Sequence, residues 1–152
     1  MALETILLAV GPGDADRADE LATAVVDVAK PAGATVDLAH VFTQSEYDEV
    51  LERLDFDVGV DEVHPDEVAA RHATIRELAA VLDESDVEYE VHGAVGQHGP
   101  AIVDLATDVD ADRVVVGGRT RSPAGKAVFG STAQEVLLSA PCPVTFVRGS
   151  EA

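Results

Sequence analysis

The hydrophobic residues of this chain form two kinds of pattern that alternate along the sequence. Short uninterrupted apolar runs at 4–10 and 113–117 predict strands buried on both faces. Segments with apolar residues three or four positions apart predict amphipathic helices. Further strands are predicted at 34–42, 87–93 and 143–148. Helices are predicted over 18–29 and from about 64, 99 and 131. Such alternation is typical of an α/β, Rossmann-like fold, with parallel strands and helices on both faces of the sheet.

Three segments need separate interpretation. Residues 87–93 alternate strictly between apolar and polar side chains, which indicates one wet face and places this strand at a sheet edge. Residues 43–62 are acidic with a short helical pattern in Val50, Leu51 and Leu54, and we expect either a mobile loop or an excursion beside the functional site. The helix from 64 is predicted to continue through His72, because the apolar stripe does. Its members are Val68, His72, Ile75, Leu78, Ala79 and Leu82.

Composition narrows the class of protein. The 152 residues suit one domain over 1–152. A net charge of −19 argues against nucleic acid or an anionic membrane as a partner. The excess of acidic over basic residues favours a halophilic protein in a high-salt cytosol. The alternative is an acidic protein from a mesophilic organism. No apolar run approaches the roughly 20 residues of a membrane span, and the N-terminus lacks a signal-peptide pattern, so we expect a cytoplasmic protein.

One segment, 113–134, departs from the acidic composition because it contains four basic residues and no acid, a formal charge of +4. Its strand breaks at Gly117 and Gly118, which let a ligand approach the backbone closely. The segment ends with Gly130, Ser131 and Thr132, where free N–H groups at a helix N-terminus favour an anion. The pattern predicts a phosphate site; the alternative is a plain turn with a helix cap. The basic residues are Arg113, Arg119, Arg121 and Lys126.

This segment resembles the C-terminal part of the universal stress protein family. The family pattern is Gly, two residues, Gly, nine residues, Gly and Ser or Thr, followed by a helix and a Pro-Cys-Pro-Val strand. Gly117, Gly130 and Ser131 match it at the right spacing, and so does PCPVTFVR at 141–148. The resemblance extends over essentially the whole chain. It implies a five-stranded parallel sheet in the order 3-2-1-4-5 and homodimers formed through the last strand.

The resemblance also implies a ligand, because one branch of the family binds ATP. An adenine nucleotide, ATP or AMP, is therefore expected, and Mg²⁺ can accompany ATP. In that branch the glycine loop and its Ser or Thr hold ribose and phosphates, and the end of the second strand contacts adenine. Positive charge near the phosphates is expected from Arg121 and Lys126. The implied contacts are Gly11, Val41, Gly117, Gly118, Arg119, Thr120, Gly130, Ser131 and Thr132.

Two departures from the family pattern leave the function open. Thr120 stands where the second motif glycine belongs, and Gly11 stands where nucleotide-binding members usually carry an Asp that receives the adenine amino group. The chain is thus interpreted as a nucleotide-binding regulatory or stress-response module. The alternatives are a nucleotide-free dimeric interaction protein with a lapsed site, and an enzyme that hydrolyses or transfers nucleotides. We expect at most slow hydrolysis, since no general base is identifiable.

The remaining polar candidates favour structural roles. Asp14 or Asp16 is expected to cap the helix at 18–29 rather than bind Mg²⁺. His72 lies on an apolar stripe and is expected to be a partly buried structural residue. His92 and His98 flank a glycine-bearing turn and are expected at the surface. The histidines lack metal-ligand spacing, so we predict no metal site and no catalytic residue.

Overall fold

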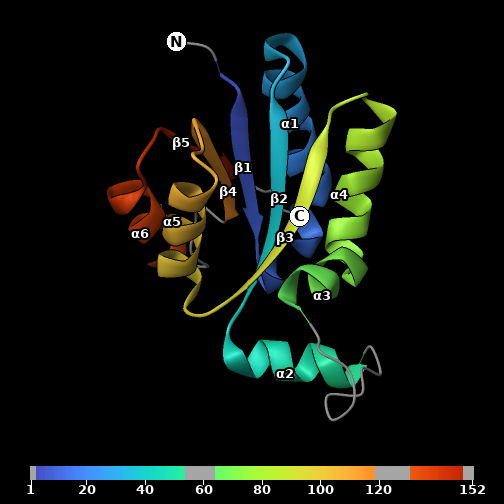
Figure 1. The fold of residues 1–152 in the computed structure, drawn as a ribbon, viewed down its shortest axis with the longest axis vertical. Coiled ribbons are helices and arrows are strands. Elements are labelled where there is room, and N and C mark those ends of the chain that lie inside the picture. Colours follow the sequence, from blue (N-terminus) through green and yellow to red (C-terminus); the bar gives the residue numbers. More distant parts are fainter. Residues whose placement is uncertain (1–2, 54–63, 119–130, 149–152) are drawn as a thin grey trace, which may run out of the picture.

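The computed structural model describes residues 3–53, 64–118 and 131–148. Within these ranges strands and helices alternate as the apolar pattern predicts (Figure 1). The strands are β1 (Thr5–Val10), β2 (Thr35–Phe42), β3 (Tyr89–Val95), β4 (Arg113–Gly118) and β5 (Val144–Arg148). The helices are α1 (Ala18–Ala32), α2 (Gln44–Arg53), α3 (Pro65–Arg71), α4 (Ala73–Glu84), α5 (His98–Asp108) and α6 (Ser131–Ser139). A short 3₁₀ helix, η1 (Pro12–Arg17), precedes α1.

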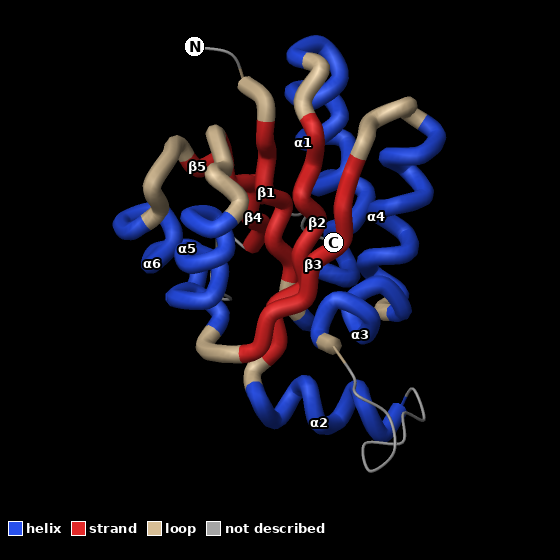
Figure 2. The backbone as a smooth tube through the Cα atoms, in the orientation of Figure 1, coloured by secondary structure: helices blue, strands red, loops and turns tan. Residues whose placement is uncertain are grey.

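The five strands form one parallel sheet in the order β3-β2-β1-β4-β5. This order confirms the expected 3-2-1-4-5 arrangement and the edge position of the alternating strand β3. Helices α1 and α4 cover one face, and α5 and α6 cover the other (Figures 1 and 2). Strand order reverses at β1, which pairs with β2 on one side and β4 on the other. In such sheets, ligands bind beside the carboxyl ends of the strands at this switch point.

The central strands are apolar without interruption because both of their faces are covered. In β1, Ile6 and Leu8 pack toward α1 and α4, whereas Leu7 packs toward α5 and α6. All three side chains are fully buried. Val114–Val116 of β4 are buried as well, so the full burial predicted for these two strands is confirmed. Among the described residues, no helix is long and apolar enough to cross a bilayer.

The acidic segment after β2 begins with a helix, α2, which contains Val50 and Leu51 of the predicted short helical pattern but starts several residues before them. Its Tyr47 and Leu51 pack against Phe42 at the end of β2. The helix starts with a reciprocal pair: Thr43 Oγ1 accepts from the Glu46 N–H at 3.2 Å, and the Thr43 N–H donates to Glu46 Oε1 at 2.8 Å. This capping box was readable as Thr-x-x-Glu. Residues 54–63 lie outside the described residues.

The prediction of a single helix from residue 64 is wrong, because the helix is interrupted at His72 and forms two helices, α3 and α4. The backbone of His72 is extended (φ −69°, ψ 137°), and its Nδ1 accepts a hydrogen bond from the Thr74 N–H at 3.3 Å. The apolar stripe continues across the interruption, because Val68 before it and Ile75 after it are both buried. Hydrophobic periodicity therefore could not reveal the interruption. His72 itself is half-buried, as predicted.

Candidate functional site

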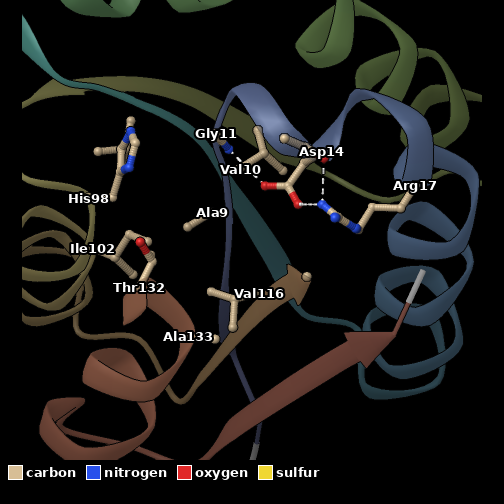
Figure 3. Close-up of a pocket in the computed structure, with 13 residues that line it drawn as sticks. Ala9, Val10, Gly11, Asp14, Arg17, His98, Ile102, Val116, Thr132 and Ala133 are labelled. Atoms are coloured by element: carbon tan, nitrogen blue, oxygen red, sulfur yellow. Dashed lines mark hydrogen bonds and ion pairs between the residues drawn. The ribbon is translucent and has the colours of Figure 1, made fainter. Parts of the chain in front are cut away.

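A cavity of about 180 Å³ opens at the switch point, where the carboxyl ends of β1 and β4 diverge (Figure 3). Its walls come from separate parts of the chain: the β1–α1 connection, the end of β2, α5, the end of β4 and the start of α6. Apolar side chains form much of the lining, among them Val41, Ile102 and Val116. The volume is below the roughly 300–1,000 Å³ of a complete small-molecule site. The described walls therefore enclose only part of a nucleotide-sized ligand.

Four of the residues expected to bind nucleotide lie around this cavity: Gly11, Val41, Gly117 and Thr132. They come from four segments far apart in the sequence. Gly118 is not among the described lining residues and lies against Phe146 instead, where a Cβ would come within 3.0 Å of the ring. The predicted start of the last helix at Ser131 is confirmed. The expected contacts Arg119, Thr120, Arg121, Lys126 and Gly130 lie outside the described residues.

Gly117 permits a close approach between the end of β4 and the β1–α1 connection. A Cβ built on Gly117 would lie 2.8 Å from Arg17 Cδ and 3.2 Å from both Asp14 Oδ1 and Leu21 Cδ2. A larger residue would displace the Arg17 side chain from this position. The glycine interpreted as part of a ligand loop therefore also has a packing function at the cavity wall.

An ion pair of Asp14 and Arg17 forms the polar side of the cavity. Arg17 Nη1 lies 2.5 Å from Asp14 Oδ1, and the Gly11 N–H donates to Asp14 Oδ2 at 2.8 Å. Burial raises the pKa of the Asp14 carboxyl, and the hydrogen bonds from Gly11 and Arg17 oppose this shift. The expected capping of α1 by Asp14 or Asp16 is wrong, because the N-cap residue of α1 is Arg17 and no side chain caps the helix there. Asp14 instead belongs to the capping box of η1, where its carboxylate accepts from the Gly11 N–H.

Arg17 is a cavity residue that sequence reasoning missed. Its signal was an i, i+3 acid–base pair directly after the first buried strand. Arg113 does not contribute to the positive charge expected beside the phosphate site. It begins β4 and so lies at the opposite end of the strand from Gly117. One of the four basic residues of the glycine-rich segment is therefore away from the cavity, while Asp14 places a carboxylate within it.

His98, expected at the surface, lines the cavity as the first residue of α5. Its side chain is 27% exposed, and its Nε2 lies 2.7 Å from Glu46 Oε1. Burial opposes ionisation of Glu46, but hydrogen bonds from the Thr43 N–H and from His98 outweigh burial and hold the pKa of the Glu46 carboxyl below its ordinary value. A Cβ on Gly11 would come within 4.0 Å of His98 Nε2. A polar ring therefore faces the space that a side chain at position 11 would enter.

The doubly wound sheet and the cavity at its switch point define a Rossmann-like α/β protein. The model of the universal stress protein family matches residues 2–148, and the chain belongs to this family. A universal stress protein of Mycolicibacterium smegmatis is 38% identical over 80 residues, which are 52% of this chain and 62% of that relative. The match thus spans less than two thirds of the relative's length.

Solved structures share the fold over nearly the whole chain. A universal stress protein from Archaeoglobus fulgidus is 27% identical, with 95% of this chain and 98% of that chain covered at a TM-score of 0.73. A universal stress protein from Archaeoglobus fulgidus in complex with dAMP is 24% identical, with 97% and 100% covered at a TM-score of 0.67. The second similarity concerns the fold alone.

Proposed function

We propose that this universal stress protein binds an adenine nucleotide, ATP or AMP, at the β1–β4 cavity and acts as a regulatory module in a stress response. The observation that carries the proposal is the meeting of Gly11, Val41, Gly117 and Thr132 around one cavity. The resemblance to the family implies nucleotide contact for all four residues, and they come from separate elements. The fold relative solved with dAMP is consistent with the choice of ligand.

The cavity suggests how each part of a nucleotide would be held. The base would pack on Val41 and Ile102, which supply apolar contact area. His98 would take the place of the Asp missing at Gly11 as a polar partner of the base. The phosphates would lie toward the start of α6, where Thr132 offers a hydroxyl and the helix N-terminus favours negative charge.

Positive charge for the phosphates would come from Arg17, together with Arg119, Arg121 and Lys126 of the glycine-rich segment. Mg²⁺ would enter with ATP, held by the phosphates. Asp14 is the carboxylate among the described lining residues, and both of its oxygens already accept hydrogen bonds. An ion at Asp14 would therefore have to share these oxygens with the Gly11 N–H and the Arg17 guanidinium.

The alternative is a nucleotide-free interaction protein with a lapsed site. One observation favours it: Asp14 engages the Arg17 guanidinium in the cavity and offsets its charge. Both alternatives include a homodimer formed through β5, an edge strand with mostly half-buried side chains. The net charge of −19 supports a cytoplasmic, high-salt setting for either one.

Replacing Thr132 with Val is expected to weaken AMP binding about tenfold, because a hydrogen bond to a charged group contributes about 1.5 kcal/mol or more. Valine keeps the shape of threonine and removes only the hydroxyl. Isothermal titration calorimetry with AMP and ATP at high salt measures the change. The matched control is Thr23→Val, at an exposed position of α1. Equal affinity of Thr132→Val and wild type would contradict the phosphate position, and no binding by wild type would favour the lapsed site.

A further inference from the structure

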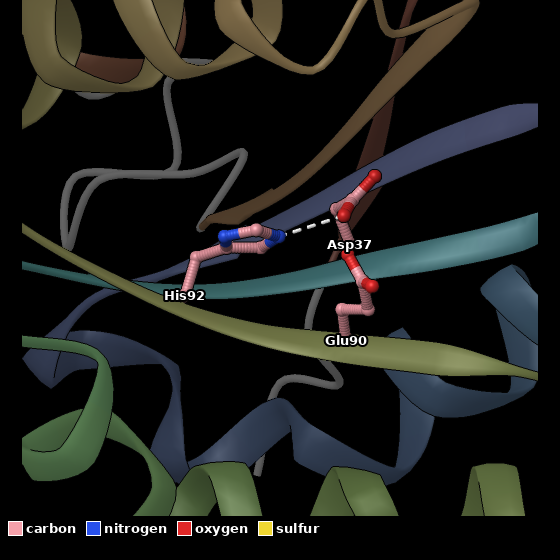
Figure 4. A group of neighbouring side chains, drawn as sticks. All are labelled: Asp37, Glu90 and His92. Carbon is pink, nitrogen blue, oxygen red and sulfur yellow. Dashed lines mark hydrogen bonds and ion pairs between the residues drawn. The ribbon is translucent and has the colours of Figure 1, made fainter.

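We propose that Asp37, Glu90 and His92 form a binding site for a divalent transition-metal ion, with Zn²⁺ as the ion that best suits these ligands. The three side chains converge on one face of β2 and β3 (Figure 4). Each offers one ligand atom, and these atoms all lie within 4.8 Å of one another. The site is separate from the cavity, because none of these three residues lines it. Asp37 lies four positions before the cavity residue Val41 in β2.

The strand register brings these ligands together. Asp37 of β2 lies directly opposite Glu90 of β3, and His92 follows two positions later on the same face. His92 Nε2 lies 2.7 Å from Asp37 Oδ1. Because both strands are held by the backbone ladder, the backbone positions of the three ligands are fixed before an ion binds. Glu90 and His92, the polar positions that predicted a solvent-exposed face of β3, therefore lie beside the Asp37 carboxylate of β2.

The charges of the cluster favour a cation. The side chain of Asp37 is only 8% exposed, and a buried carboxylate is costly without a positive partner. Glu90 stands directly across the strand pair, where like charges repel. In the part of the chain that the structure describes, the ion-pair partner of Asp37 is His92, and no ion pair involves Glu90. One imidazole cannot balance two carboxylates, whereas a divalent ion can.

The ligand types select among divalent ions. An imidazole nitrogen suits Zn²⁺ and its neighbours in the first transition row better than Mg²⁺ or Ca²⁺. Three protein ligands with water in the fourth position form a common tetrahedral Zn²⁺ arrangement, in which ligand atoms lie about 3.3 Å apart. The 2.7 Å contact between His92 and Asp37 must therefore open slightly. His92 Nε2 would then offer its lone pair to the ion and release any proton it carries to water. The ion would tie the edge strand β3 to β2.

The test is a titration of tag-free, metal-depleted protein with Zn²⁺ by calorimetry, and with Co²⁺ by visible absorption. We expect one ion per chain and a tetrahedral Co²⁺ spectrum. Glu90→Gln and His92→Gln should each lower the affinity about tenfold or more. Glu90 is exposed, so its variant keeps the fold even if Asp37 or His92 variants do not.

Matched controls separate this site from adventitious binding to an acidic surface. Glu77→Gln, exposed on α4 across the sheet, and His64→Gln, exposed before α3, should bind Zn²⁺ like wild type. Weak binding of several ions with no tetrahedral Co²⁺ spectrum would overturn the proposal. So would unchanged affinity in both Glu90→Gln and His92→Gln, which would leave Asp37 and His92 as a structural hydrogen bond. The titration contains no nucleotide, so its result is independent of the cavity.

Discussion

Acidification from about pH 7 to about pH 4 is expected to lower the free energy of unfolding by about 3 kcal/mol more in wild type than in a His40→Phe variant. The His40 side chain is fully buried in β2, and its pKa falls from 6.5 to about 3. Burial is the main cause, and repulsion from His72 adds to it. The unfolded chain takes up a proton at this position below its ordinary pKa. The folded chain does not do so until about pH 3, so stability falls as the pH drops between these two values.

The surroundings of His40 explain why a proton is so unfavourable there. The ring stacks on Phe42 at a centroid distance of 4.2 Å and lies 4.1 Å from the His72 ring. Neither ring nitrogen has a hydrogen-bond partner among the described residues. An imidazolium ion in this position would be desolvated, and the Val41 backbone and the Glu46 carboxylate offset only part of that cost. Phenylalanine keeps an aromatic ring of similar size and removes the titrating group.

Urea denaturation across this pH range, at constant salt, measures the difference. His64→Phe is the matched control, because His64 is exposed before α3 and should leave the wild-type pH dependence intact. Salt is held constant because the protein carries a net charge of −19, and acidification changes its self-repulsion. Identical pH dependence in wild type and His40→Phe would contradict the assignment to His40.

Replacing Gly93 with Ala is expected to destabilise the protein by about 3 kcal/mol, because β3 and the start of α3 touch backbone to backbone. A Cβ on Gly93 would lie 2.0 Å from the Pro65 carbonyl oxygen and 2.3 Å from its carbon. The Gly93 N–H also donates to Asp66 Oδ1 at 2.7 Å, which fixes the two segments together. Neither backbone can yield as a flexible side chain would, so α3 must shift away from the sheet.

Gly13→Ala is the matched control, since a Cβ at Gly13 would meet nothing within 4 Å. Thermal and urea unfolding of both variants, compared with wild type, measure the difference. The control should remain within about 0.5 kcal/mol of wild type, as surface substitutions usually do. Equal stability of the two variants would contradict the contact between β3 and α3.

The sequence predicts the parts of this fold that depend on local periodicity. The uninterrupted apolar runs of β1 and β4 predict burial on both faces, and the alternation in β3 predicts an edge strand; both predictions are confirmed. The break at His72 escapes such reasoning, because the apolar stripe continues on both sides of it. The break depends on a single side chain that caps α4 and packs against His40, a residue from a distant strand.

The candidate site is predictable where a motif defines it and not where tertiary contacts create it. The resemblance to the family indicated Gly11, Val41, Gly117 and Thr132, all of which line the cavity. Arg17 and His98 reach the cavity through the packing of η1 and α5 against the sheet, which no spacing in the sequence encodes. Likewise, the meeting of Asp37 with Glu90 and His92 depends on the register of β2 and β3.

The central claim is that an adenine nucleotide occupies the cavity between β1 and β4, and an amide NMR titration of the isotopically labelled protein with AMP and ATP tests it most directly. We predict saturable shifts centred on the amides of Gly11, Val41, Gly117 and Thr132, with the exposed face of α4 unchanged. Absence of saturable shifts at millimolar nucleotide, or shifts centred on another surface, would contradict the claim.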